Sequence, residues 1–294
     1  MALCLACSLI ACGEFSLYDQ LVRYKWWFLN GYMSSTGECF DIGGATRTAI
    51  ETFQRRQKRL ADELNVQINE LDYYHENQLG KSINLQCGES DAAGNGSVMR
   101  LAPVPLFFHR DPKSGVKFSG LSSRATHGSK LAYDACRFYG ALILGTLKNL
   151  KKKELLDENF IKNHKDWFGN EPLDDIIKEI AEGSYKKKQP GKKDGIRGKG
   201  YVVFSIEAAL WAFYNDEDSF KKGVLLAVNL GDDADTTAAI YGQLAGAYYS
   251  VENIPKKWVE NVYASTFIMR ISDWIAERGS QWYDQQSTGD ETNF

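Results

Sequence analysis

Residues 129–150, SKLAYDACRFYGALILGTLKNL, predict a long apolar helix that ends at the lysines of residues 151–153. Its uncharged run, residues 138–147, is about half the length that a membrane-spanning helix needs, which favours a helix of the protein core. Helical periodicity recurs along most of the chain, whereas strand signals are scarce. Six prolines in 294 residues leave room for long helices. The sequence therefore predicts an all-α fold.

Several further segments have helical periodicity. Helices are expected at Met1–Cys12, Leu17–Asn30, Ala45–Leu64, Ser97–Phe108, Glu154–Ile161, Leu173–Ala181, Val202–Tyr214, Ser219–Asn229, Asp235–Tyr249 and Lys256–Ala276. Residues 65–90 are polar and are expected to be irregular. No internal repeat and no Gly/Pro/Ser-rich linker divides the chain. We therefore expect one compact domain over residues 1–280, followed by a polar, frayed tail at residues 281–294.

The composition is that of an ordinary globular protein, with 44% hydrophobic and 25% charged residues. The net charge of −3 gives no general attraction to nucleic acid or to an anionic membrane. Residues 184–200 are locally basic, with seven Lys or Arg against one Asp. Few aromatic residues lie among these charges, so a flexible, solvated loop is favoured over a nucleic-acid site.

The cysteines and the first residues bear on localisation. Six cysteines in a chain of this length do not suggest a disulfide framework, and the C-x-x-C of Cys4 and Cys7 has no second pair to complete a zinc site. The apolar segment Met1–Cys12 has no preceding Lys or Arg, so it lacks the charged region of a signal peptide. We expect a cytoplasmic protein without a membrane segment.

A cluster of acidic residues stands directly before an apolar helix, in residues 231–237, GDDADTT. Three Asp in four residues repel one another unless a cation joins them, and carboxylate and hydroxyl oxygens suit Mg²⁺, Mn²⁺ or Ca²⁺. Carboxylates also cap a helix and interact favourably with its dipole. A metal site and a simple helix cap both remain open from the residues alone.

Two other segments are candidates for binding or catalysis. In residues 91–100, DAAGNGSVMR, glycines bracket Asn95 before a helix, and the backbone N–H groups of such a turn can hold an anion. An ordinary Asn-Gly turn explains the same pattern. His127 lies in a turn of small residues before the long apolar helix, where a structural role and a catalytic role are both possible.

Seven motifs occur in an order that resembles a known family. They are GYMSSTG at 31–37, FDIG at 40–43, AGNGSVMRLAP at 93–103, TH at 126–127, GYVV at 200–203, GDDADTTA at 231–238 and YGQLAGAYY at 241–249. Together they resemble the ADP-ribosylglycohydrolase family, which includes the dinitrogenase reductase-activating glycohydrolase. The resemblance runs from Met1 to about Gly279.

The resemblance implies an all-α hydrolase that removes ADP-ribose from a protein side chain or a related acceptor, with two Mg²⁺ or Mn²⁺ ions in a cleft. It implies that Asp233, Asp235 and Thr236 are metal ligands. It implies that ADP-ribose is held by Asn95, Gly96, Ser97, Met99 and His127. Asp91 lies beside the Asn95 turn and is the candidate carboxylate for proton transfer. ADP-ribose or an ADP-ribosylated protein would be the partner of a monomeric protein.

One departure from the family pattern concerns the start of the chain. Members carry a Thr-Asp-Asp-Thr motif immediately before the helix that matches Met1–Cys12, and this sequence begins after that point. We therefore expect a chain that lacks its first helix and half of its metal ligands. Two functions remain open: a metal-dependent ADP-ribosyl hydrolase of weak or no activity in this form, and a non-catalytic ADP-ribose-binding or structural member.

Overall fold

The computed structural model describes residues 1–191 and 195–290, in which there are 18 α-helices, two short 3-10 helices and no β-strand. The all-α prediction is confirmed. The α-helices are α1 (Ala2–Cys12), α2 (Leu17–Asn30), α3 (Gly44–Leu64), α4 (Ile68–Leu71), α5 (Glu76–Leu79), α6 (Gly96–Met99), α7 (Pro103–Phe107), α8 (Pro112–Ser123), α9 (Lys130–Leu147), α10 (Lys152–Leu155), α11 (Phe160–Asn163), α12 (Lys165–Phe168), α13 (Asp175–Ala181), α14 (Val202–Tyr214), α15 (Phe220–Asn229), α16 (Ala234–Tyr249), α17 (Lys256–Glu260) and α18 (Ser265–Asp290). The 3-10 helices are Ser184–Lys187 and Val251–Asn253.

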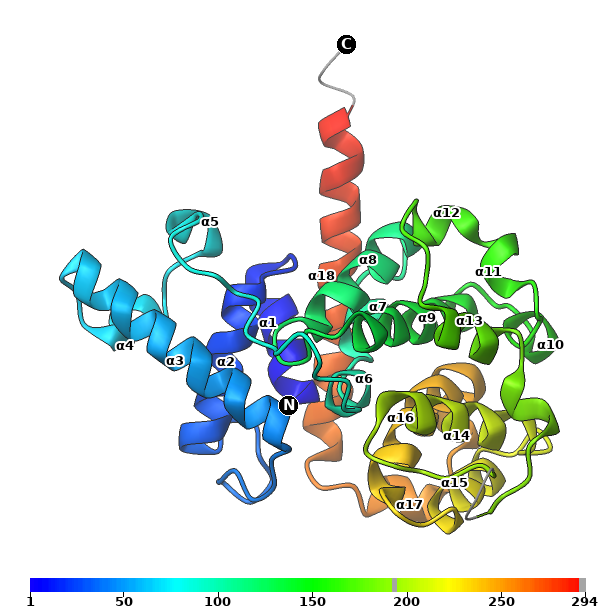
Figure 1. Cartoon of the computed structure of the whole chain (residues 1–294). Helices are drawn as coiled ribbons and strands as arrows, with labels where there is room; N and C mark the ends of the chain where they lie inside the picture. Colours follow the sequence, from blue (N-terminus) through cyan, green and yellow to red (C-terminus); the bar gives the residue numbers. More distant parts are fainter. Residues whose placement is uncertain (192–194, 291–294) are drawn as a thin grey trace.

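The helices form a single domain around a central group of α1, α7 and α9 (Figure 1). Helices α2 to α5 lie on one side of this group, and α13 to α17 lie on the other. Helix α18 crosses the middle and packs on both α1 and α7, so the last helix contacts the first. Its second half extends beyond the other helices in this view.

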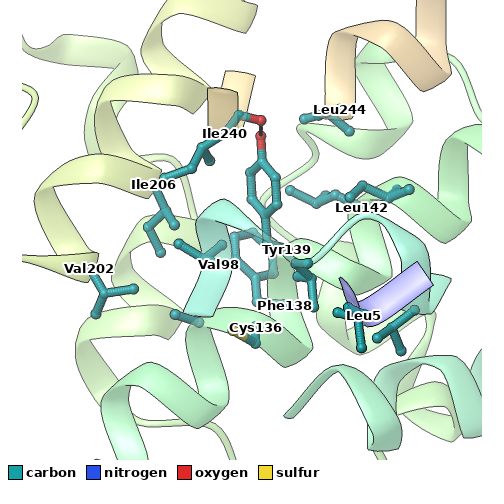
Figure 2. Close-up of a cluster of buried hydrophobic side chains, with 14 of the residues drawn as sticks. Leu5, Val98, Cys136, Phe138, Tyr139, Leu142, Val202, Ile206, Ile240 and Leu244 are labelled. Carbon is teal, nitrogen blue, oxygen red and sulfur yellow. Dashed lines mark hydrogen bonds between the residues drawn. The ribbon is translucent and has the colours of Figure 1, made fainter. Parts of the chain in front are cut away.

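Helix α9 is the most deeply buried long helix, since nearly all of its residues from Leu131 to Thr146 are buried. Helices α8, α16, α14 and α7 are among those that pack on it. The Tyr139 hydroxyl, at the centre of the apolar cluster in Figure 2, donates a hydrogen bond of 2.6 Å to the carbonyl oxygen of Ile240 on α16. Gly140 lets α8 approach closely, because a Cβ there would collide with Ser119. This core fixes α16, which carries the acidic segment at its start.

Several helix boundaries follow local signals in the sequence. Helix α2 ends before Gly31, which has a φ of 65°, a left-handed conformation that glycine adopts at low cost. Helix α1 begins at Ala2 and has no side-chain cap at Met1. The helix expected at Glu154–Ile161 is instead the pair α10 and α11, and the expected single helix at Lys256–Ala276 is the pair α17 and α18.

Two segments differ more strongly from the prediction. Helix α18 continues to Asp290, so residues 281–290 of the expected tail are helical, and residues 291–294 lie outside the described residues. Trp282 explains the extension in part, because its ring packs edge-on against Phe108 at 4.8 Å between centroids. Helix α8 was not expected at all. Its start has a clear signal, since Asp111 caps the N-terminus and Pro112 occupies the first helical position.

The basic segment at residues 184–200 is held in place where the structure describes it, which excludes residues 192–194. The Lys188 ammonium contacts both carboxylate oxygens of the buried Glu207 at 2.8 Å. Arg197 pairs with Asp232. No helix in the described part of the chain is both long enough and apolar enough to cross a membrane.

Candidate functional site

The Asn95 turn meets the acidic segment in space. The Asn95 side chain is 8% exposed, and its Nδ2 donates to Oδ2 of Asp233 at 2.6 Å and to Oγ of Ser205 at 2.9 Å. The backbone N–H of Asn95 also donates to the carbonyl oxygen of Gly200 at 3.0 Å. Two motifs that lie 138 residues apart in the sequence therefore form one site.

The acidic segment does more than cap α16. Asp233 is the N-cap residue, yet its side chain makes no capping hydrogen bond, because one carboxylate oxygen faces Asn95. Oδ1 of Asp235 accepts from the backbone N–H of Thr236 at 2.9 Å, and the Thr236 hydroxyl lies 3.4 Å from Sδ of Met99. The sequence left a simple helix cap open as an explanation, but the Asp233 carboxylate does not form one.

His127 lies beneath the Asn95 turn and is 3% exposed. A Cβ on Gly94 would lie 3.2 Å from its Nε2, and a Cβ on Gly96 would lie 3.1 Å from its Cε1. The two glycines therefore let the turn approach the imidazole ring closely. Burial, with a further contribution from the positive charge of Arg100, lowers the pKa of His127 to about 3. The ring is neutral at physiological pH.

Arg100 and Thr126 define the orientation of this neutral ring. Nη2 of the buried Arg100 donates to Oγ1 of Thr126 at 2.7 Å, and that hydroxyl lies 2.8 Å from Nδ1 of His127. Because the hydroxyl accepts from Arg100, its own proton is free to be donated to Nδ1. This arrangement favours the tautomer with its proton on Nε2, which faces the glycines of the turn. The ring can therefore donate a hydrogen bond from Nε2 without any change in its charge.

The remaining predicted site residues occupy different positions. Ser97 is 1% exposed, and its hydroxyl accepts from the Ser123 hydroxyl at 3.0 Å, which places it in the core below the turn. Met99 is 38% exposed. Asp91 is exposed, and in the described part of the chain it forms no hydrogen bond or ion pair with the other candidates. The structure thus joins Asn95, His127 and the acidic segment, and it leaves Asp91 apart.

The donor set for a metal ion is incomplete. Asp233, Asp235 and Thr236 carry hard oxygen atoms of the kind that Mg²⁺ or Mn²⁺ prefers. Within the residues that the structure describes, no group of three or more His, Cys, Asp or Glu side chains is placed to hold an ion. These residues fit part of one cation site and do not fit a complete two-ion centre.

Sequence reasoning missed the segment that joins the two halves. This segment is residues 197–201, and Ser205 of α14 contacts it. The Ser205 hydroxyl is fully buried, donates to the carbonyl oxygen of Lys199 at 2.6 Å and accepts from Asn95. The sequence signal for this segment is the GYVV motif at residues 200–203. Its position in the order of the family motifs indicates no particular contact.

A cavity of about 620 Å³ lies away from this site, between the end of α1, α2 and the residues around α5. Several of its charged lining groups already have partners. Asp72 accepts from Trp26 at 2.8 Å and pairs with Lys25, and Glu76 accepts from Ser16 at 2.9 Å. This cavity therefore offers few free polar groups to a ligand, and the site beside Asn95 is the better candidate.

Comparison with known proteins identifies relatives of the whole chain. A sequence model of the ADP-ribosylglycohydrolases matches residues 1–285. ADP-ribosylarginine hydrolase Tri1 of Serratia proteamaculans is 34% identical over 278 residues, which are 94% of this chain and 65% of that protein. The protein of the same name from Pseudomonas putida is also 34% identical, over 96% of this chain and 66% of its own length. The chain thus spans just under two thirds of the length of these two relatives.

A more distant relative and a solved structure have similar names. ADP-ribosyl-[dinitrogen reductase] glycohydrolase of Rhodospirillum rubrum is 30% identical over 172 residues, which are 58% of this chain and 51% of that protein. A solved structure described as an ADP-ribosylglycohydrolase-related protein complex superposes with a TM-score of 0.70 at 29% identity. The superposition covers 95% of this chain and 79% of that one.

Proposed function

The chain belongs to the ADP-ribosylglycohydrolase family, and we propose that it binds ADP-ribose and hydrolyses the bond between ADP-ribose and a protein side chain. The observation that carries this proposal is the contact between Asn95 and Asp233, which joins the turn motif to the acidic motif. The Tri1 relatives are named ADP-ribosylarginine hydrolases, so we propose arginine as the acceptor.

Each part of the site has a proposed role in holding ADP-ribose. The backbone N–H groups of the turn at Gly96 are suited to the pyrophosphate, since exposed N–H groups bind anions. The Nε2–H of neutral His127 donates to an oxygen of the ligand. Asp233 and Asp235 accept from ribose hydroxyls, and Asn95 keeps the Asp233 carboxylate in one orientation through its 2.6 Å hydrogen bond.

Cleavage of the bond at the anomeric carbon develops positive charge on the sugar. Carboxylates at Asp233 and Asp235 would stabilise that charge if the sugar lies against them. The water that attacks the anomeric carbon needs a group to orient it, and we propose Asp91 for that role, an exposed carboxylate without a hydrogen bond to the other candidates in the described part of the chain. His127 is not proposed as a general acid, since its pKa of about 3 leaves no proton to give up near neutral pH.

We propose that Asp233, Asp235 and Thr236 bind Mg²⁺ or Mn²⁺, but weakly in this chain, because they supply oxygens from one side only. A divalent ion bound there would polarise ribose hydroxyls and a water molecule. No step proposed above depends on it. Calorimetry with Mg²⁺ and Mn²⁺ tests this directly, and two tight sites would contradict it.

The incomplete donor set favours one alternative, a non-catalytic protein that binds ADP-ribose. Both functions share the same binding site and differ in turnover. We further propose that the partner is an ADP-ribosylated protein, that nucleic acid is not bound, and that the protein acts as a cytoplasmic monomer.

One set of experiments separates these functions. ADP-ribose affinity is measured by calorimetry for the wild type, Asn95→Ala and the exposed, matched control Lys187→Ala. We expect Asn95→Ala to weaken binding and Lys187→Ala to leave it unchanged; equal losses would show general charge attraction instead of a specific site. Release of ADP-ribose from modified arginine and serine peptides is then followed with Mg²⁺ and with Mn²⁺. Binding without release supports the non-catalytic alternative, and absence of both refutes the proposed function.

A further inference from the structure

Residues 197–201 cross the candidate site and touch both of its halves. The carbonyl oxygen of Gly198 accepts from the backbone N–H of Asp233 at 2.7 Å, and that of Gly200 accepts from the backbone N–H of Asn95 at 3.0 Å. Tyr201 forms an isolated antiparallel bridge with Gly94. The position of this segment therefore sets the distance between the Asn95 turn and the acidic segment.

An ion pair lies at one end of the segment. Nε of Arg197 donates to Oδ2 of Asp232 at 2.7 Å, and Nη2 donates to Oδ1 at 2.8 Å. Two parallel hydrogen bonds between a planar guanidinium and a carboxylate fix orientation as well as distance. The pair is only partly exposed, with side-chain exposures of 26% for Arg197 and 35% for Asp232.

Two features make this pair sensitive to displacement. Asp232 has a φ of 54°, a left-handed conformation that is unfavourable for most residues with a side chain and less so for Asp. Gly198 is packed so closely on the first turn of α16 that a Cβ would collide with Thr237. The loop is therefore held in a strained conformation against a helix. The bidentate side-chain contact of Arg197 holds Asp232 to residues 197–201.

We propose that Arg197 is a positioning residue: its bidentate pair with Asp232 keeps Gly198 in register with Asp233 and so holds the Asp233 carboxylate towards Asn95 and the ligand. The effect on ligand binding rests on the proposed function, whereas the effect on the backbone register does not. Arg197 itself touches neither Asp233 nor Asn95 through its side chain in the described contacts, so it acts through Asp232.

The test has two independent measurements. Amide hydrogen exchange, followed for the Asp233 N–H, reports the hydrogen bond to Gly198 without any ligand. ADP-ribose affinity by calorimetry reports the consequence for the site. Both are measured for Arg197→Ala, Asp232→Asn, the double variant, Arg197→Lys and the exposed control Lys187→Ala, with melting temperatures to verify folding.

We expect Arg197→Ala and Asp232→Asn each to speed exchange at Asp233 and to weaken ADP-ribose binding by about 1.5-fold to fivefold, the range for loss of an exposed ion pair. The double variant should lose less than the sum of the two single losses, because both substitutions remove the same pair. Arg197→Lys should restore only part of the loss, since lysine lacks the fork. The control Lys187→Ala should match the wild type.

Other outcomes overturn the proposal or locate the failure elsewhere. Unchanged exchange at Asp233 in Arg197→Ala refutes the positioning role. Faster exchange with unchanged ADP-ribose affinity refutes the link to the site. If the wild type binds no ADP-ribose, the proposed function fails, while the exchange measurement still decides whether Arg197 holds the register.

Discussion

Lowering the pH from 7.5 to 5 is expected to reduce the free energy of unfolding by about 2 kcal/mol through His127 alone. Burial, and secondly the charge of Arg100, lower the pKa of His127 from 6.5 to about 3 in the folded protein. At pH 5 the unfolded chain therefore binds a proton at this position and the folded protein does not, so stability is lost as the pH falls below 6.5. The loss depends mainly on the unfolded pKa, because the folded group stays neutral throughout this range.

The measurement is urea unfolding across this pH range for the wild type and His127→Asn. Asparagine keeps a polar group near Thr126 and does not titrate, so the variant should lose about 2 kcal/mol less between pH 7.5 and 5, whatever its stability at neutral pH. The exposed His75 gives the matched control, because His75→Asn removes a histidine at an N-cap position where asparagine is also favoured. Parallel pH profiles for the wild type and His127→Asn would refute a neutral, buried His127.

Four further substitutions test the packing of the fold. Gly279→Ala places a Cβ against a carbonyl oxygen of α7 and should lower the free energy of unfolding in urea by about 1–3 kcal/mol. Gly246→Ala places a Cβ in open space on α16 and should raise the free energy of unfolding by up to about 1 kcal/mol. Tyr139→Phe leaves a buried carbonyl without its 2.6 Å donor and should cost about 1–2 kcal/mol, with a matching fall in melting temperature. Lys152→Met leaves the fully buried Asp216 without its ammonium partner; a loss of about 3 kcal/mol is expected, and a loss below about 0.5 kcal/mol would contradict the buried pair.

Helices whose packing is decided by local pattern could be predicted from the sequence. Leu17–Asn30 and Val202–Tyr214 were predicted with the bounds that the structure has, because an apolar face and a glycine or polar stop mark each of them. Helix α8 was missed because its apolar pattern is weak and its glycines, such as Gly120, suit close packing on α9 more than helix formation. Tertiary contacts with α9 stabilise it, and such contacts leave no periodicity in the sequence.

The contacts within the site also could not be predicted from local sequence patterns. The residue types at Asn95, His127 and Asp233 indicated binding chemistry, but no local rule states that the Asn95 amide meets the Asp233 carboxylate 138 residues away. Nor does a local rule state that Gly94 is needed because an imidazole ring lies beneath it. Motif order in a family suggests such groupings, whereas the segment at residues 197–201 that joins the halves carried no chemical signal of its own.

The packing of α18 on α1 has a consequence for synthesis of the protein. Nε of Arg278 donates to the carbonyl oxygen of Ile10 at 3.1 Å, and these residues lie 268 positions apart. At about 5–20 residues per second, ribosomes need on the order of 10 to 50 seconds to make the chain between them. During that interval the side of α1 that α18 covers has no partner from the C-terminal region, so nascent chains are most vulnerable to aggregation or chaperone capture through this apolar helix.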